Sequence, residues 1–212
     1  MHAIVAAGGD ALDECWRAAL PARALVVAAD SGLGHVYALG LRPDLVVGDF
    51  DSVSAADLAR AELEGTHIER HPTDKDATDL ELALDAARAR GVTDVTIIGA
   101  GGGRLDHELA GFALLAAPQW ASMRITAFIG SARLTVVHDH ATFDGLLGSI
   151  VTLLAIGGAA SGVTTEGLRW PLTDAELSPT STLGVSNEIV ESPARVTVRT
   201  GVLFAIQPQG DR

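Results

Sequence analysis

The sequence predicts an α/β domain over residues 1–130, followed by an all-β domain over residues 131–212. In the first part, short apolar runs alternate with segments of helical periodicity. Such alternation is typical of a mainly parallel sheet with helices on both faces. In the second part, the apolar runs are short, rich in β-branched residues and separated by Gly, Pro or Ser turns. That pattern favours a small β-sandwich, joined to the first domain by a short linker near residues 130–132.

The first part contains six expected strands and five expected helices. The helix at 79–90 has the clearest pattern, since Thr78 or Asp76 can cap it, apolar residues recur on one face and Gly91 can end it. Asp10 is the expected cap of the first helix. The order of elements predicts a Rossmann-like sheet. We expect strands at 4–7, 24–29, 45–47, 67–69, 95–98 and 124–129, and helices at 10–20, before Gly40, at 55–64, at 79–90 and at 105–116.

The second part shows no helical period. We expect its strands at 134–138, 149–155, 161–164, 185–191, 194–199 and 202–206. One stretch, 145–165, lacks any charged residue, which raises the question of a membrane span. It contains five glycines, so paired strands around a glycine turn explain it better than a spanning helix does.

Composition narrows the class of protein. The net charge of −12 opposes binding to nucleic acid, and no basic stripe with interleaved aromatic residues is present. Cys15 is the single cysteine, so no intrachain disulfide can form, which suits a reducing cytosol. The N-terminus lacks a basic region before its apolar residues, and a secretory signal is therefore not expected. We expect a cytoplasmic protein that binds neither nucleic acid nor membranes.

Four acidic segments follow, or closely follow, predicted strands. Because the carboxyl ends of strands in an open α/β sheet face the ligand crevice, we expect these segments to converge there. Clustered carboxylates repel one another unless a cation lies among them, and Mg²⁺ prefers carboxylate and water ligands. The sequence therefore predicts magnesium-dependent phosphoryl transfer. The segments are 30–32 (DSG), 48–52 (GDFDS), 74–79 (DKDATD) and 101–107 (GGGRLDH).

Three of these carboxylates are candidates for catalysis and metal binding. Asp49 and Asp51 lie two apart on a turn and can both reach one cation, while Asp79 lies in the first turn of its helix and faces the same crevice. Capping of a turn or helix is the alternative for Asp51 and Asp79. Arg104 follows three glycines and precedes a helix, where it can bind phosphate bidentately. An ordinary turn with a surface arginine is the alternative there.

Further candidates lie close to these residues in the sequence. Asp106 can orient or deprotonate an acceptor hydroxyl, or bind metal through water, and His107 is either catalytic or a helix-start histidine. We expect Asp30 to contact metal-bound water or substrate. Thr78 is a further nucleotide-binding candidate, and Lys75, the only lysine of the chain, either reaches a phosphate or neutralises its acidic neighbours.

Six segments, in this order, resemble the thiamine pyrophosphokinase family. The resemblance implies ATP-dependent transfer of a pyrophosphoryl group to the hydroxyethyl arm of thiamine, giving thiamine diphosphate and AMP. It implies Mg²⁺ held by Asp49, Asp51 and Asp79, with ATP as co-substrate. It also implies a homodimer whose active sites are shared between the α/β domain of one subunit and the β-domain of the other. The segments are 30–32, 42–52 (RPDLVVGDFDS), 74–79, 102–107 (GGRLDH), 164–172 (TTEGLRWPL) and 184–188 (GVSNE).

The last two segments supply candidates for thiamine recognition. Thiamine carries a permanent positive charge on its thiazolium ring, and a tryptophan face both attracts a cation and stacks on a flat heterocycle. Trp170 is the candidate, with core packing as the alternative. Ser186 and Asn187 can hydrogen-bond the aminopyrimidine ring, although turn chemistry uses the same residue types.

Three other functions compete with this interpretation. Residues 45–52 resemble the phosphorylated Asp-x-Asp strand of haloacid-dehalogenase-like phosphatases, but these need a later lysine and none follows Lys75. A non-catalytic thiamine-binding protein is the second alternative, although it would not need the whole set of carboxylates. An enzyme with the same chemistry and another heterocyclic alcohol as acceptor is the third.

Overall fold

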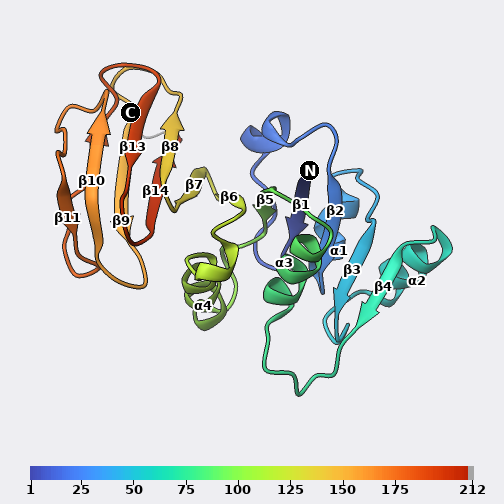
Figure 1. The fold of residues 1–212 in the computed structure, drawn as a ribbon. Helices are drawn as coiled ribbons and strands as arrows, with labels where there is room; N and C mark the ends of the chain where they lie inside the picture. The colour runs from blue at the N-terminus through green and yellow to red at the C-terminus, as the bar shows by residue number, and fades with distance from the viewer. Residues whose placement is uncertain (210–212) are drawn as a thin grey trace. The chain divides into compact units, whose positions relative to one another are not determined.

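The computed structural model describes residues 1–209 (Figure 1). The chain divides into two compact units. The first unit comprises Met1–Gly111 together with Ile125–Gly130, and the second comprises Phe112–Arg124 together with the chain from Ser131 onwards.

The first unit contains the parallel strands that the sequence predicts. The strand order is β6-β5-β1-β2-β3-β4, and β5, β1, β2, β3 and β4 pair in parallel. Each strand lies within two residues of its predicted range. The strands are β1 (His2–Ala6), β2 (Leu25–Ala29), β3 (Leu45–Gly48), β4 (His67–Arg70), β5 (Asp94–Ile98) and β6 (Arg124–Ile129).

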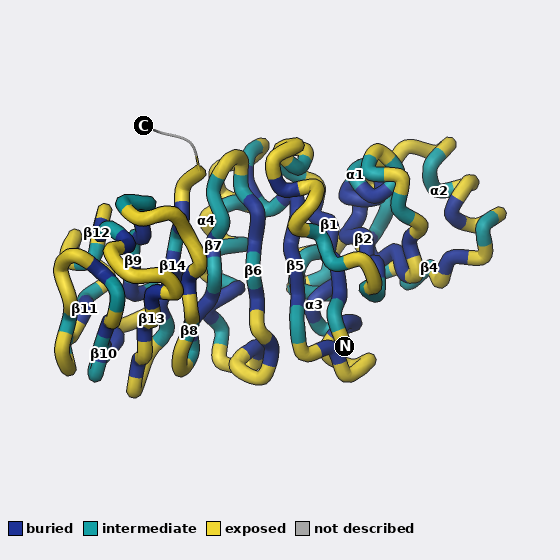
Figure 2. Tube along the Cα trace, turned by 90° about the horizontal axis from the view of Figure 1, so that it is seen from above, coloured by how far each residue is buried: buried dark blue, intermediate teal, exposed yellow. Residues whose placement is uncertain are grey.

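The order of the strands reverses at β1. The chain moves from β1 through β2 and β3 to β4 on one side, and β5 then pairs with the other side of β1. Ala3, Ile4, Val5 and Ala6 of β1 are all buried, as the dark strand in Figure 2 shows. In open α/β sheets, ligands bind beyond the carboxyl ends of the strands at such a reversal.

Four α-helices connect these strands. They are α1 (Gly32–Ala38), α2 (Ala55–Leu63), α3 (Asp79–Ala89) and α4 (Leu105–Leu115). Leu33 and Val36 of α1 share a core cluster with Ile4 and Ala6 of β1. Helix α3 packs against β1, β2 and β3, and its start is as predicted, since Thr78 caps it by accepting a hydrogen bond from the Glu81 amide.

The predicted helix at 10–20 is wrong. Only a 3₁₀ helix, η1 (Glu14–Ala19), is present, and its cap is Asp13 rather than Asp10. The amide of Gly9 donates to the Gly99 carbonyl and that of Asp10 to the Gly101 carbonyl. These bonds hold residues 9 and 10 beside the turn after β5, and helical backbone begins only at Glu14.

The second unit consists mainly of antiparallel strands in two sets. One set has the order β12-β9-β14-β7 and the other β11-β10-β13-β8. One core cluster draws residues from both sets, among them Phe143, Leu153, Val163 and Leu203. The strands are β7 (Ala132–Val137), β8 (His140–Phe143), β9 (Ile150–Ala155), β10 (Ala160–Glu166), β11 (Ala175–Leu177), β12 (Asn187–Glu188), β13 (Ala194–Thr197) and β14 (Leu203–Pro208). A short 3₁₀ helix, η2 (Pro118–Trp120), precedes them in this unit.

The structure differs from the predicted strands of the second unit in two respects. The expected strand at 185–191 shrinks to Asn187–Glu188, because Gly184 and Ser186 have φ of 100° and 57°, which interrupts an extended chain. Strands β8 and β11 were not expected. The uncharged stretch 145–165 forms strands as predicted, namely β9 and most of β10, but the two belong to different sheets and do not pair with each other. No helix in the described part of the chain is both long and apolar enough to cross a membrane.

Candidate functional site

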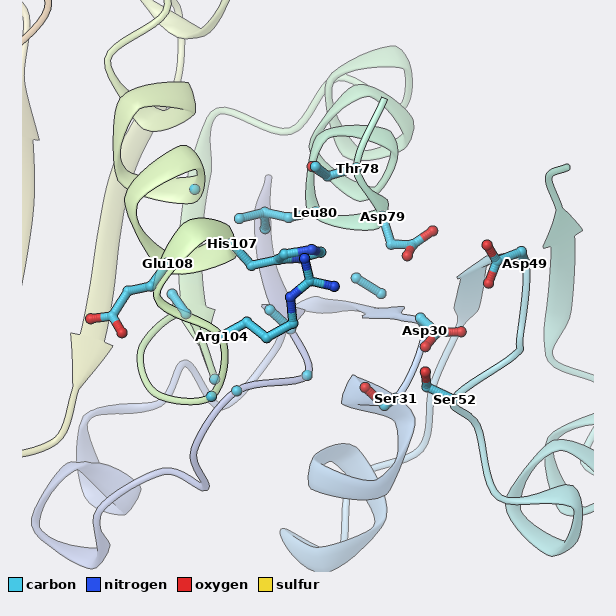
Figure 3. Close-up of a pocket in the computed structure, with 18 of the residues that line it drawn as sticks. Asp30, Ser31, Asp49, Ser52, Thr78, Asp79, Leu80, Arg104, His107 and Glu108 are labelled. Atoms are coloured by element: carbon cyan, nitrogen blue, oxygen red, sulfur yellow. The ribbon is translucent and has the colours of Figure 1, made fainter. Parts of the chain in front are cut away.

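A pocket of about 700 Å³ lies in the first unit at the carboxyl ends of β1, β2, β3 and β5 (Figure 3). This volume is within the usual range for small-molecule sites. The pocket therefore occupies the strand reversal at β1, where the acidic segments were expected to converge. Its lining includes Gly8, Gly9, Asp30, Ser31, Asp49, Asp51, Ser52, Lys75, Thr78, Asp79, Gly102, Gly103, Arg104, His107 and Glu108.

Glycines allow the chain to pass closely around this pocket. A Cβ atom on Gly9 would overlap the carbonyl oxygens of Gly101 and Gly99, so the turns after β1 and β5 can lie side by side only with glycine there. His35 supports the same turn, with Nε2 2.7 Å from the Gly9 carbonyl oxygen.

Three carboxylates gather at the ends of β2 and β3. Asp30, Asp49 and Asp51 each place one oxygen within 4.8 Å of the others. The amide of Asp30 donates to the Val47 carbonyl at 2.9 Å, which ties the two strand ends together. Phe50 has a φ of 65°, and this turn brings both carboxylates of the 49–51 segment toward Asp30. This group of three is called the carboxylate cluster below.

Asp30 is the buried member of the carboxylate cluster, with 7% of its surface exposed. Its Oδ1 atom is buried and has no hydrogen-bond partner in the described structure. Burial raises the pKa of the Asp30 carboxyl above its ordinary value, and neighbouring carboxylates raise it further, against the lowering effect of a backbone hydrogen bond from Ser31. A buried carboxylate oxygen without a donor, beside two further carboxylates, fits a divalent cation with oxygen ligands.

The third predicted metal ligand, Asp79, stands outside the carboxylate cluster. Its Oδ1 lies 3.0 Å from Lys75 Nζ, which also lies 3.0 Å from Asp49 Oδ2. The contact with Asp49 is a hydrogen bond, whereas that with Asp79 is an ion pair without hydrogen-bond geometry. Burial alone would lower the pKa of Lys75, but the two pairs raise it above its ordinary value. Lys75 thus forms ion pairs with two carboxylates of the pocket, Asp49 and Asp79.

Arg104 and His107 extend from the start of α4 into the pocket, across from Asp30 and Asp79 (Figure 3). The arginine follows Gly102 and Gly103, whose φ values are 81° and 77°. Because both glycines adopt the left-handed region, the turn can present the arginine at the helix start.

Asp106 forms a bidentate ion pair with Arg104. The Nε–Oδ1 and Nη2–Oδ2 distances are 3.1 and 2.6 Å. Hydrogen bonding from Arg104 lowers the pKa of Asp106 to about 2. Asp106 does not belong to the described lining of the pocket, so in this structure it orients Arg104.

Glu108 is a pocket residue that sequence reasoning missed. Its Oε2 accepts a hydrogen bond of 3.1 Å from the Gly102 amide, which fixes the glycine turn to α4. A carboxylate in the first turn of a helix that follows glycines is a signal for such a contact. Ser31 and Ser52 also line the pocket and were present in the acidic segments without being singled out.

The candidates for thiamine binding gather in the second unit. Asn187 is buried, and its Oδ1 accepts from the Trp170 amide at 3.1 Å while its Nδ2 donates to the Trp170 carbonyl at 2.7 Å. Trp170 is 56% exposed, so it is not a core residue. The amide of Ser186 donates to Thr152 Oγ1. Asn187 therefore holds the backbone of the segment that displays the tryptophan.

Two protein-family models match the chain, one in each half. The family model of the thiamin pyrophosphokinase catalytic domain matches residues 16–127. That of the thiamin pyrophosphokinase vitamin B1 binding domain matches residues 134–203. The chain belongs to the thiamin pyrophosphokinase family.

Individual members of the thiamin pyrophosphokinase family match most of the chain. Thiamine pyrophosphokinase from Bacillus subtilis (strain 168) is 26% identical over 186 residues, which cover 86% of each sequence. The crystal structure of thiamin pyrophosphokinase from Geobacillus thermodenitrificans has a TM-score of 0.84 and 28% identity, covering 100% of this chain and 99% of that chain. The crystal structure of the Bacillus subtilis protein has a TM-score of 0.86 at 24% identity over the full length of both chains, which shows a common fold.

Proposed function

We infer that this protein transfers a pyrophosphoryl group from ATP to the hydroxyethyl group of thiamine, giving thiamine diphosphate and AMP. The observation that carries this conclusion is the match of both domains of the thiamin pyrophosphokinase family, in order, to one chain. A haloacid-dehalogenase-like phosphatase would leave the second unit and the glycine turn before Arg104 unexplained. The complete set of pocket carboxylates disfavours a purely thiamine-binding protein.

The pocket of the first unit supplies what phosphoryl transfer requires. The reaction needs charge neutralised on phosphate oxygens and the acceptor oxygen held in line. A divalent cation, which we propose to be Mg²⁺ held by Asp30, Asp49 and Asp51, would neutralise charge on the polyphosphate when bound. Arg104 offers a planar guanidinium that binds phosphate oxygens bidentately. We propose residues 1–130 as the catalytic domain, with a Rossmann-like sheet.

The remaining pocket residues have supporting roles in this proposal. Asp79 completes the acidic lining and pairs with Lys75, and Thr78 fixes the start of α3 beside the nucleotide. Asp106 orients Arg104 through the bidentate pair. His107 lines the pocket next to Arg104 and is proposed to contact the nucleotide.

We propose residues 131–212 as a thiamine-binding β-sandwich. Trp170 offers an exposed aromatic face for the thiazolium cation, and Ser186 offers a hydroxyl for the aminopyrimidine. The side-chain amide of Asn187 already binds the backbone of Trp170. We therefore propose that Asn187 supports thiamine binding indirectly, by holding Trp170 in position.

We also propose a cytoplasmic homodimer with shared active sites. Six of the ten large hydrophobic side chains that are exposed in the described residues belong to the second unit. Exposed apolar residues favour a protein–protein interface where they form one patch, and we propose that these residues contribute to the dimer contact. These residues are Leu146, Leu147, Trp170, Leu183, Val185 and Val190.

The decisive experiment is incubation of the chain with thiamine, ATP and Mg²⁺, followed by mass analysis of the products. We expect thiamine diphosphate and AMP in equal amounts. Thiamine binding by calorimetry without AMP release would instead support a non-catalytic binding protein. A transient acyl-phosphate that is lost in Asp49→Asn would support the phosphatase.

A further inference from the structure

The only lysine of the chain lies between two carboxylates of the pocket. Lys75 Nζ is 3.0 Å from Asp49 Oδ2 and 3.0 Å from Asp79 Oδ1, and the lysine side chain is 13% exposed. An ammonium group removed from water is costly unless it is paired. The two ion pairs are therefore what keeps Lys75 at this position, and Lys75 in turn holds α3 and the turn after β3 together.

Asp49 belongs to this pair and to the carboxylate cluster at the same time. Its Oδ2 contacts Lys75, and its Oδ1 accepts a hydrogen bond of 3.3 Å from the Asp51 amide. One Asp49 oxygen also lies within 4.8 Å of ligand atoms of Asp30 and Asp51. Two cations that use one carboxylate repel each other at such short range. The ion pair of Lys75 with Asp49 must therefore weaken the binding of a divalent cation to Asp49. By reciprocity, a bound cation weakens the ion pair by the same free energy.

We propose that Lys75 is a built-in counter-ion of the metal site. In the metal-free chain it neutralises Asp49 and Asp79, and it leaves Asp49 when a divalent cation binds to the carboxylate cluster. The released ammonium then faces the same pocket as Arg104, where an anionic substrate binds. This inference rests on the proposed function and adds a positioning residue to it.

The choice of lysine over arginine fits this role. The chain uses arginine at fourteen other positions and lysine only here. A guanidinium binds carboxylates as a rigid planar fork, whereas an ammonium is a point charge on a flexible stem. A lysine can thus leave one carboxylate while it keeps contact with another. An arginine between Asp49 and Asp79 would hold both more firmly and oppose the entry of metal.

The first test measures the binding of Mn²⁺ alone to the full chain, by electron paramagnetic resonance of the free ion at constant pH. We expect Lys75→Gln to bind Mn²⁺ about fivefold tighter or more, at the lower end of ordinary coupling between two sites. Lys75→Arg should bind it no tighter than the wild type. Arg60→Gln is the matched control, since Arg60 pairs with Glu64 on the surface of α2 and its loss changes the net charge equally. Equal or weaker binding in Lys75→Gln would overturn the proposal.

The second test needs no variant. Because the chain has one lysine, protein labelled with ¹³C at the lysine ε-carbon gives a single side-chain ε-CH₂ signal. We expect Mg²⁺ to move this signal saturably, with the same dissociation constant as its binding. A signal that stays in place at saturating Mg²⁺ would refute the release of Lys75. If the same preparation forms AMP from ATP and thiamine, the proposed function stands even where this inference fails.

Discussion

Asn187 binds both backbone polar groups of Trp170, accepting from its amide at 3.1 Å and donating to its carbonyl at 2.7 Å. A buried side chain of β12 thus fixes the backbone at Trp170, while the tryptophan ring stays exposed. The position of Trp170 is therefore fixed through its backbone hydrogen bonds rather than through burial of its ring.

Asn187→Ala tests this support. Leaving partly buried backbone groups without partners costs roughly 1–3 kcal/mol. We therefore expect a lower melting temperature and weaker binding of thiamine, both measured on the purified chain. Asn187→Asp retains the acceptor but sets a buried carboxylate oxygen against the Trp170 carbonyl, so its effects should be at least as large. Thiamine affinity unchanged in Asn187→Ala would show that the Trp170 segment does not depend on this residue.

Trp170→Ala removes the proposed cation–aromatic contact. We expect thiamine affinity to fall by roughly 1–2 kcal/mol, while ATP affinity stays the same, with both measured by calorimetry. Trp170→Phe keeps an aromatic face and should recover part of the loss. An equal loss of affinity for both ligands would point instead to a disrupted second unit.

Asp51→Asn removes one member of the carboxylate cluster. The variant should fold normally and lose at least about a hundredfold in turnover, on the order of 3 kcal/mol of barrier. The measurement is AMP release at saturating substrates. Asp85→Asn, which alters a half-exposed carboxylate paired with Arg88 on α3, is the control and should keep full turnover. Wild-type turnover in Asp51→Asn would remove this residue from the metal site.

Asp30→Asn should stabilise the metal-free chain and abolish its metal binding. Burial raises the pKa of Asp30, so the folded chain binds this proton more tightly than the unfolded chain does. The stabilising effect of the proton is complete below the unfolded pKa and is lost as pH rises through the folded pKa. Wherever Asp30 is ionised, its charge therefore opposes folding. We expect a higher melting temperature for Asp30→Asn without metal, measured by calorimetry, and a lower one would contradict this.

Asp106 should titrate near pH 2. Hydrogen bonding from Arg104 depresses its pKa to about 2, and carboxyl chemical shifts measured by NMR can follow this titration. Since the folded pKa lies below the unfolded value, the contribution to stability is present above that unfolded value. It is lost as pH falls toward 2. Both side chains are mostly exposed, so the change in stability should be small. In Arg104→Gln the pKa of Asp106 should return toward its ordinary value, and a pKa that stays near 2 would rule out the ion pair as its cause.

Periodicity predicted the strands of the first unit and helix α3 because those signals are local. The length of an apolar run and the spacing of residues along a helix are properties of consecutive residues. The capping role of Thr78 was predictable for the same reason, since Thr78 binds the amide of Glu81 only three residues later.

The errors arise where distant backbone decides the local conformation. Asp10 has the residue type of a helix cap, but its amide is bound by the carbonyl of Gly101. Sequence reasoning placed Asp30 at the rim of the pocket without grouping it with Asp49 and Asp51. That grouping depends on the hydrogen bond between Asp30 and Val47 at neighbouring strand ends, and therefore on the order of strands in the sheet.

The reversal of strand order at β1 has a consequence for how this protein acquires its site. The carboxylate cluster and Asp79 precede residue 80, whereas the turn that presents Arg104 follows β5, which pairs with the other side of β1. A nascent chain that ends before residue 94 therefore contains the carboxylate cluster and lacks Arg104. Such a fragment would attract cations and lack the arginine that retains a polyphosphate, so nucleotide binding should mark completed folding of the first unit.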